Sequence, residues 1–237
     1  MFEVIKKGLE TSLQDYPGRV GFLNQGFPPS GPMDSWSFRL ANLVVGNNAE
    51  EAALECQFMG PTLKFETDHV ISICGGDMQP KIDGVPIPLW ESILIKTGQT
   101  LELSFCLTGA RTYIAFSGGI KSDLWLGSKS TFHKAAIGGI EGSAIKDNQK
   151  VQLGISVGQA GKKIKKEVIP KMSNDGLWEI EVVRGPNDDW LDNNGYEIFL
   201  AAKWKLQARS DRTGFRLDGP LLTFTEKATD KSPEHGY

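Results

Sequence analysis

The chain has 237 residues, which is enough to bury a hydrophobic core in one large all-β domain or in two smaller domains. Its 26 lysines and arginines stand against 29 acidic residues, and the net charge of -3 argues against nucleic acid or an anionic membrane as the main partner. No apolar run approaches the length of a membrane span, and the N-terminal MFEVIKKGLE lacks the apolar segment of a secretory signal. We therefore expect a cytoplasmic protein.

The first informative segment is residues 11–48, which read TSLQDYPGRVGFLNQGFPPSGPMDSWSFRLANLVVGNN. Its glycines and four prolines fix a backbone path that an ordinary surface loop does not need. The hydrogen-bonding residues placed on this path are Gln14, Asp15, Arg19, Asn24, Ser30 and Asp34. A stiff polar loop that runs into a helix suits an anion or a carboxylate-bearing substrate. The alternative is an ordered connector over the mouth of a barrel.

A helix is predicted directly after this loop, over residues 35–45. Asp34 is suited to the N-cap, and Gly46 followed by Asn47 is a typical stop. The apolar residues at helical spacing, expected to face the core, are Trp36, Leu40, Leu43 and Val44.

Short apolar runs then recur about every ten residues, which is the rhythm of a β-barrel or β-sandwich. The predicted strands are 52–58, 62–65, 70–74, 92–96, 100–105 and 111–116. Residues 81–86 predict a hairpin, because Asp83-Gly84 supplies the positive φ angles of a type I′ turn.

Residues 117–142 form a second glycine-rich region, in which Ser128, Ser130 and Thr131 offer hydroxyl and backbone N–H groups to an anion. The spacing of a phosphate-binding P-loop is absent, so we expect that this chain does not bind ATP through one. Residues 161–175 read as a charged linker, and we interpret their lysines as a solvated face. We expect lobes at 1–160 and 176–237, with further strands at 177–183 and 197–206.

The cysteines and histidines do not indicate a metal site. Cys56, Cys74 and Cys106 lie in apolar, strand-like contexts and suit buried reduced thiols better than disulfides or a zinc site. The histidines at positions 69, 133 and 235 share no ligand spacing, and we expect surface or packing roles for them.

Arginines on stiff loops are the clearest candidates for anion binding. Those beside glycines or turn residues are Arg19, Arg111, Arg212 and Arg216. A guanidinium held in this way can grip a carboxylate or a carbonate-like anion through two hydrogen bonds. The alternative is that they pair with acidic residues and tie the loops down; the acidic candidates are Asp15, Asp34, Glu55 and Asp211. No Ser-His-Asp set or paired-carboxylate motif is found.

Several ordered motifs resemble one known family. They are QDYPGRVG, GFPPSGPMDSWSFRLANLVVGN, LECQFMGPTLKF, DGVPIPLW, GARTYIAFSGGI, LGSKSTF and SDRTGFRLDGP. Together they resemble the carboxyltransferase domain (subdomains A and B) of urea carboxylase, also called urea amidolyase, the KipA proteins and the C component of the prokaryotic 5-oxoprolinase. The resemblance implies an all-β fold with minor α-helix, a cyclophilin-like β-barrel in two lobes. Members of that family continue beyond Tyr237, so we expect the second lobe to be incomplete.

The resemblance implies three functions. The preferred one is a component of an ATP-dependent 5-oxoprolinase, which opens 5-oxoproline to glutamate together with two partner proteins. One partner would be a KipI-like protein similar to the B component of 5-oxoprolinase, and the other would be similar to its A component. The second function is the carboxyltransferase component of a biotin-dependent enzyme acting on urea or a similar amide. The third is a non-enzymatic KipA-type protein that antagonises a KipI-type kinase inhibitor. The sequence has no biotin carboxylase region and no biotin-bearing Met-Lys motif.

We place the expected site in the first polar loop and its neighbours. The expected catalytic residues are Gln14, Asp15, Arg19, Ser30, Asp34 and Arg111. The expected substrate-binding residues are Asn24, Gly31, Met33, Ser128, Ser130 and Arg212. No covalently held cofactor is expected: the complex would use ATP, and in the second function a partner would carry biotin. On this basis Arg19→Ala should abolish turnover and leave the fold intact.

Overall fold

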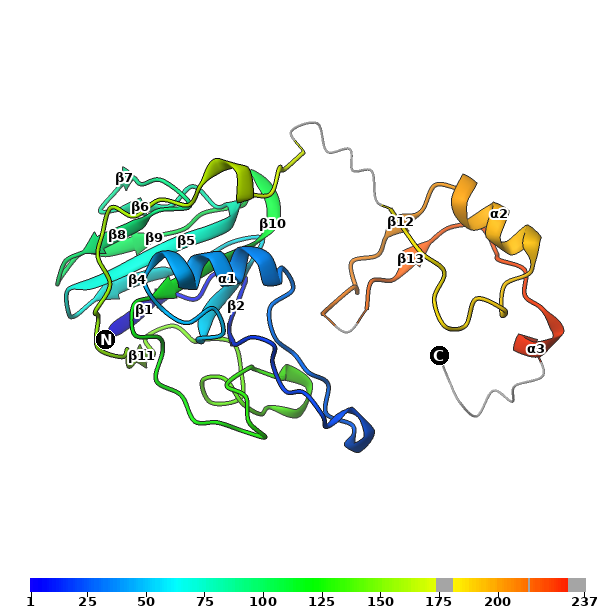
Figure 1. The fold of residues 1–237 in the computed structure, drawn as a ribbon, viewed down its shortest axis with the longest axis horizontal. Coiled ribbons are helices and arrows are strands. Elements are labelled where there is room, and N and C mark those ends of the chain that lie inside the picture. Colours follow the sequence, from blue (N-terminus) through cyan, green and yellow to red (C-terminus); the bar gives the residue numbers. More distant parts are fainter. Residues whose placement is uncertain (174–180, 213, 230–237) are drawn as a thin grey trace. The chain divides into compact units, whose positions relative to one another are not determined.

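The computed structural model describes residues 1–173, 181–212 and 214–229. The chain forms two compact units, Met1–Leu177 and Trp178–Tyr237, which are described separately below (Figure 1). The expected lobe boundaries at 160 and 176 remain predictions. Within the expected linker, the N–H groups of Gly161 and Ile164 donate to the backbone carbonyl oxygens of Ser92 and Trp90 in the first unit.

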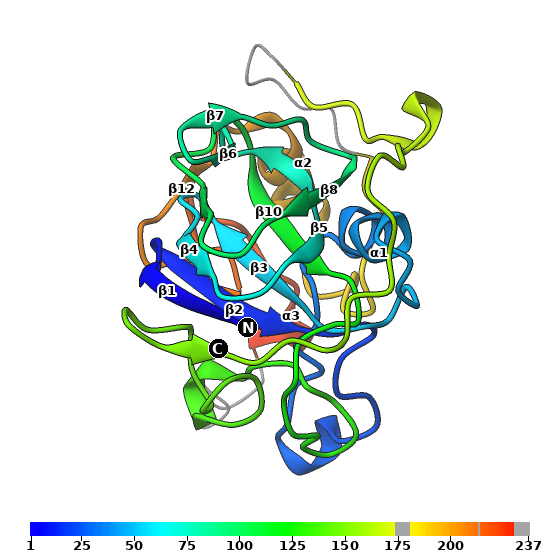
Figure 2. The same ribbon diagram turned by 90° about the vertical axis from the view of Figure 1, so that its left-hand side faces the viewer.

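The first unit is built from two antiparallel sheets that lie face to face (Figures 1 and 2). The six-stranded sheet has the order β11 (Lys150–Val151), β1 (Phe2–Lys6), β4 (Thr62–Phe65), β9 (Thr100–Glu102), β6 (Lys81–Ile82) and β7 (Val85–Pro86). The five-stranded sheet has the order β2 (Glu10–Gln14), β3 (Ala53–Gln57), β10 (Thr108–Phe116), β5 (His69–Asp77) and β8 (Ser92–Ile95). Short 3₁₀ turns are η1 (Leu23–Gln25), η2 (His133–Ala135) and η3 (Lys166–Val168).

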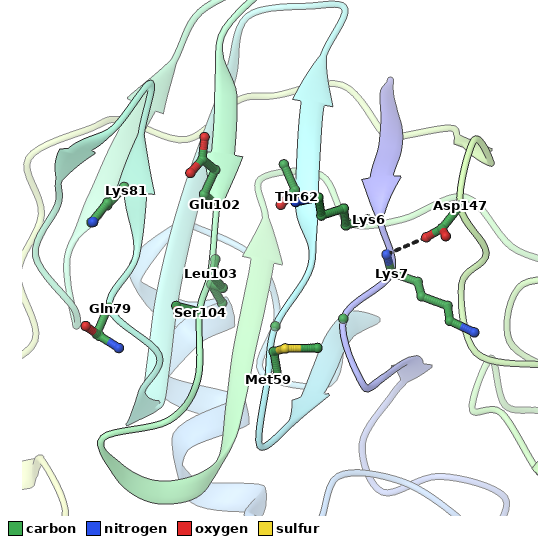
Figure 3. Close-up of a pocket in the computed structure, with 12 residues that line it drawn as sticks. Lys6, Lys7, Met59, Thr62, Gln79, Lys81, Glu102, Leu103, Ser104 and Asp147 are labelled. Carbon is green, nitrogen blue, oxygen red and sulfur yellow. Dashed lines mark hydrogen bonds between the residues drawn. The ribbon is translucent and has the colours of Figure 1, made fainter.

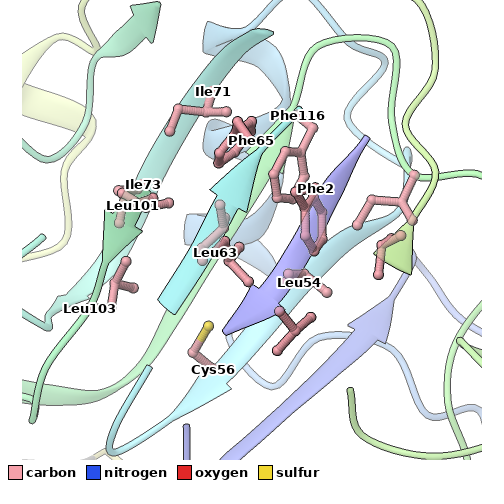
Figure 4. Close-up of a cluster of buried hydrophobic side chains, with 14 of the residues drawn as sticks. Phe2, Leu54, Cys56, Leu63, Phe65, Ile71, Ile73, Leu101, Leu103 and Phe116 are labelled. Carbon is pink, nitrogen blue, oxygen red and sulfur yellow. The ribbon is translucent and has the colours of Figure 1, made fainter. Parts of the chain in front are cut away.

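The expected all-β class with minor helix is confirmed, and the closed barrel is not found. In the described part of the chain the strands form open sheets, each ending in two edge strands. The main core fills the space between the two sheets of the first unit, as Figure 4 shows for Phe2, Leu54 and Phe116. The rings of Phe2 and Phe116 stack with their centroids 5.2 Å apart. Each buried phenylalanine contributes roughly 1.5–3 kcal/mol to folding.

Helix α1 (Ser35–Val44) covers the outer face of the five-stranded sheet against β5 and β10 (Figure 2). The cap prediction is confirmed, because Asp34 Oδ1 accepts from the N–H groups of Trp36 at 3.1 Å and Ser37 at 3.0 Å. The predicted apolar face is wrong in part. The side chains that pack on the sheet are those of Phe38, Ala41 and Val44, and Trp36 and Leu43 are 50% and 51% exposed. The Trp36 indole N–H instead donates to the carbonyl of Val168 at 2.8 Å.

The strands predicted between residues 52 and 116 are confirmed, with shifts of up to three residues at their ends. The hairpin is also confirmed, since Asp83 and Gly84 have φ angles of 50° and 80° between β6 and β7. Strands β1 and β2 were not predicted. Both are only five residues long, and β1 pairs with strands far along the chain, β4 and β11.

The second unit contains α2 (Asn193–Ala201), β12 (Lys205–Leu206), β13 (Leu217–Asp218) and α3 (Glu226–Thr229). The strand predicted at 197–206 is wrong over most of its length, because α2 occupies residues 197–201 and only Lys205–Leu206 form a strand. Asp192 caps this helix, with Oδ1 accepting from the N–H of Gly195 at 2.7 Å. The strand predicted at 177–183 lies outside the described residues up to 180, and residues 181–183 form no strand. Gly195 is the only described residue of this unit that is buried.

The cysteines are free thiols; Cys56 and Cys74 are buried, as predicted, and Cys106 is half-buried. Burial raises the pKa of the Cys56 thiol to about 12.

His235 lies outside the described residues. In the part of the chain that the structure describes, no helix is long and apolar enough to cross a bilayer, and no group of three or more histidine, cysteine or acidic side chains is arranged to hold a metal ion.

His69 should make the stability of the first unit depend on pH. Its side chain is 3% exposed, and Nε2 lies 2.8 Å from the carbonyl oxygen of Ser117. Burial is the main cause that lowers its pKa, so the unfolded chain takes up the proton at a higher pH than the folded chain. The free energy of unfolding should therefore fall as the pH drops below about 6.5, until the folded-state imidazole is also protonated. Guanidinium chloride unfolding at about pH 7 and about pH 5 should show a smaller loss in His69→Gln, and an equal loss would contradict this role.

Candidate functional site

The polar loop between β2 and α1 folds back on itself. The N–H of Arg19 donates to the carbonyl oxygen of Pro29 at 2.6 Å and closes the base of the loop. Gly18 has a φ of +86°, and a Cβ at this position would lie 2.4 Å from the same carbonyl oxygen. The close approach of the two strands of the loop therefore requires glycine at this position.

The first end of the loop is fixed by the carboxylate of Asp15. Its Oδ1 accepts from the hydroxyls of Ser128 and Ser130, both at 2.5 Å, and its Oδ2 accepts from the N–H of Lys129 at 2.7 Å. Both serines are fully buried. The serine hydroxyls that were predicted to bind an anion therefore donate to the carboxylate of Asp15, which belongs to the protein itself.

Arg19 points inward from the same end of the loop and is 0% exposed. Its Nη2 donates to the carbonyl of Ser130 at 2.8 Å, its Nε donates to that of Trp125 at 3.2 Å, and the guanidinium lies 4.7 Å from the centre of the Trp125 ring. Burial lowers the pKa of Arg19, and the nearby charge of Asp15 opposes this shift. Phe27 packs edge-on against Trp125 at 4.8 Å. Arg19 therefore joins the two glycine-rich regions.

The second end of the loop is fixed by Glu55 on β3, which is 3% exposed. Its Oε2 accepts from the hydroxyl of Tyr113 at 2.9 Å and from the N–H of Met33 at 2.8 Å, and the Tyr113 oxygen accepts from the N–H of Asp34 at 2.7 Å. Its Oε1 lies 3.3 Å from Nε of Arg111 on β10. Burial first, and then the charge of Glu55, raises the pKa of the Tyr113 hydroxyl, which stays protonated and can donate.

A buried amide lies on the same face of the sheet. Ser12 lies opposite Glu55 in the pairing of β2 with β3, and Gln14 follows two residues later on the same face. Gln14 is 0% exposed, and its Nε2 donates to the Ser12 hydroxyl at 2.9 Å. Its Oε1 is buried and has no hydrogen-bond donor among the described residues. The cluster meets solvent at Arg111, whose side chain is 13% exposed.

The structure thus divides the expected site residues between two clusters. Asp15, Arg19, Ser128 and Ser130 form one, and Met33, Asp34 and Arg111 contribute to the other. Gln14 lies on the same face of the sheet as the second cluster. The remaining expected residues of the loop are Asn24, which is exposed in η1, Ser30, which has a φ of +58°, and Gly31, which has a φ of +79° and packs against the backbone of Pro17. Arg212 belongs to the second unit.

Sequence reasoning missed Tyr113, Trp125 and Lys129, and it named Glu55 only as a possible partner of an arginine. That pairing is observed with Arg111. The available signal was a glutamate inside the otherwise apolar run ALEC of β3, because an acidic residue in a buried strand needs partners. Chemically, the second cluster offers the partly exposed guanidinium of Arg111, held by the buried carboxylate of Glu55 near the start of α1.

Comparison with known proteins gives a consistent result. A family model described as the carboxyltransferase domain, subdomain A and B, matches residues 25–237. The urea amidolyase of Saccharomyces cerevisiae is 39% identical over 225 residues, which cover 92% of this chain and 12% of that protein. The C component of the Escherichia coli 5-oxoprolinase is 32% identical over 233 residues, which cover 98% of this chain and 72% of that protein. The crystal structure of the K. lactis urea amidolyase superposes with a TM-score of 0.88 at 39% identity, over 94% of this chain and 14% of that chain.

Proposed function

This chain belongs to the family of carboxyltransferase domains with subdomains A and B, and from that premise we propose that it is the carboxyltransferase component of an enzyme of the urea carboxylase class. The chain spans only 12% of the S. cerevisiae urea amidolyase, so the activity of that whole protein requires other domains or chains. The observation that supports the proposal is the Arg111–Glu55 pair beside the first turn of α1. Urea carboxylation needs donors for a carbonyl oxygen that gains negative charge, and a guanidinium is such a donor.

In this proposal Arg111 binds the carbonyl oxygen of a small ureido or amide substrate. Glu55 holds the guanidinium in place, and because it is almost fully buried the pair is weakly screened by water. Glu55 and the Asp15 cluster are positioning elements: they fix the two ends of the loop that leads into α1.

In this proposal biotin would be carried by a partner chain, and Arg111 is the residue of this chain that would contact it. Arg111 fits this group, since the ureido carbonyl of biotin would accept from its guanidinium as the carbonyl of urea would. Biotin, when present, supplies the activated carboxyl group. The residues of this chain bind and orient the acceptor amide, and ATP is used by partner domains.

A second candidate function is supported by the match to the C component of the E. coli 5-oxoprolinase, which extends over 98% of this chain and 72% of that protein. 5-Oxoproline is a lactam, so the oxygen of its ring carbonyl would accept a hydrogen bond from Arg111 as the carbonyl oxygen of urea would. In that case the partners are proteins similar to the A and B components of 5-oxoprolinase. The higher identity to urea amidolyase, 39% against 32%, favours urea.

The test combines the full chain with the biotin carboxylase and biotin carrier of a urea carboxylase and, separately, with the A and B components of a 5-oxoprolinase. Hydrolysis of ATP is measured with urea, with 5-oxoproline and without either. We expect urea-dependent hydrolysis with the first set, and a fall of about 100-fold in Arg111→Gln. Lys146→Gln is the matched control, because Lys146 forms an exposed ion pair with Glu141. Dependence on 5-oxoproline alone would establish the second function, and dependence on neither would overturn both.

A further inference from the structure

A polar groove crosses the outer face of the six-stranded sheet of the first unit (Figure 3). Its volume is about 470 Å³. Leu63 and Leu101 point from this sheet into the core, so the alternating residues Thr62 and Glu102 face outward into the groove. Helix α1 and the Arg111–Glu55 pair belong to the other sheet, on the opposite side of the core. The groove is therefore separate from the candidate functional site.

The register of the strands sets charged residues in a row across the groove. Lys6 on β1 lies opposite Thr62 on β4, Thr62 lies opposite Glu102 on β9, and Glu102 lies opposite Lys81 on β6. Neighbouring strands are about 4.8 Å apart, so the backbones at Lys6 and Lys81 are separated by about 14 Å. The order of charges along the row is positive, neutral, negative, positive.

These charges do not neutralise one another. Opposite charges directly across two strands usually pair, yet in the described part of the chain no ion pair forms between Lys81 and Glu102, and Lys6 has no carboxylate partner. Asp147, at the rim beside β1, accepts the backbone N–H of Lys7 at 2.7 Å. The row thus offers the ammonium groups of Lys6 and Lys81 at its two ends and the carboxylate of Glu102 nearer to Lys81. Lys7 and Asp147 also line the groove, at the end next to Lys6.

We propose that this groove binds a small α-amino dicarboxylate. Glu102 binds the amino group of the ligand and Lys81 binds the carboxylate next to that amine. Lys6 binds the distal carboxylate. The neutral Thr62 lies between Lys6 and Glu102, so the positive charge of the ligand must be closer to one carboxylate than to the other. A simple dicarboxylate leaves Glu102 without a partner, and an amino acid with one carboxylate leaves one lysine without a partner. The site does not depend on either reaction considered above.

The test is a calorimetric titration of the full chain with L-glutamate, with glutarate, which lacks the amine, and with 4-aminobutyrate, which lacks the carboxylate next to the amine. We expect saturable binding of L-glutamate and binding of each analogue that is weaker by about fivefold or more. Lys6→Gln, Lys81→Gln and Glu102→Gln should each weaken L-glutamate binding by about fivefold. All three side chains are exposed, so these variants should fold, and circular dichroism checks this.

Lys64→Gln is the matched control, because Lys64 is exposed on the same face of β4, two residues from Thr62, and does not line the groove. It should leave L-glutamate binding unchanged. The proposal is overturned if L-glutamate does not bind, if glutarate binds as tightly as L-glutamate, or if Lys64→Gln weakens binding as much as Lys81→Gln does. The last result would indicate a general attraction of anions to the lysines of this sheet.

Discussion

Replacing Arg19 by alanine should lower the free energy of unfolding of the first unit by about 3 kcal/mol, measured by guanidinium chloride denaturation. The substitution removes both side-chain hydrogen bonds of a buried guanidinium and its stacking on Trp125, and it leaves the carbonyl oxygens of Ser130 and Trp125 without these donors. Arg19→Lys keeps the charge but lacks the planar fork, so it should recover only part of the loss.

Arg39→Ala is the matched control for this experiment. Arg39 stacks on Tyr16 with its guanidinium 5.2 Å from the ring centre, and its side chain donates no hydrogen bond to the described residues. Its removal should cost less than about 1 kcal/mol. If Arg19→Ala instead keeps its full stability and loses turnover, Arg19 acts on the substrate, as the sequence alone led us to expect, and the inward role assigned to it is wrong.

Replacing Glu55 should have an effect of similar size through a different mechanism. Glu55→Ala removes the acceptor of Tyr113 and Met33 and leaves the charge of Arg111 without this partner, which should cost about 3–5 kcal/mol. Glu55→Gln keeps the shape and one acceptor oxygen, so it should fold with a smaller loss of about 1–2 kcal/mol. Because the guanidinium of Arg111 is then no longer held by a charge, we also expect urea-dependent turnover of Glu55→Gln to fall by about tenfold or more.

Denaturation and turnover of both variants check this prediction together. Lys146→Gln again serves as the surface control. Stability equal to that of the unmodified chain in Glu55→Ala would show that the buried carboxylate contributes nothing to the fold. Full turnover in Glu55→Gln would show that Arg111 does not depend on the charge of Glu55.

The features that the sequence predicted correctly are those encoded by neighbouring residues. The N-cap at Asp34 depends on N–H groups two and three residues later, and the turn at Asp83-Gly84 depends on the conformational freedom of those two residues. The short strands between residues 52 and 116 were readable from their apolar runs and from the turn residues between them. Local chemistry decides such elements, so a single sequence is sufficient for them.

The features that were missed depend on contacts between distant parts of the chain. The Arg19–Trp125 and Glu55–Tyr113 hydrogen bonds join residues 106 and 58 positions apart. The sequence showed that Arg19 and the serines at 128 and 130 suit anion chemistry, but not that their partners belong to the protein itself. The second half of helix α2 was mistaken for part of a strand because Ile198 and Phe199 favour strands. The cap residue of α2, Asp192, is fixed in part by Thr223, whose hydroxyl donates to it across 31 positions at 2.5 Å.

The central claim is that Glu55 serves the reaction by holding Arg111, and a double-mutant cycle on urea-dependent turnover tests it most directly. The four proteins are the unmodified chain, Glu55→Gln, Arg111→Gln and the double variant, assembled with the same partner chains. We predict that the double variant is no slower than Arg111→Gln alone, because Glu55 has no guanidinium left to hold. Losses that multiply in the double variant would contradict the claim, since they would show that the two residues act independently.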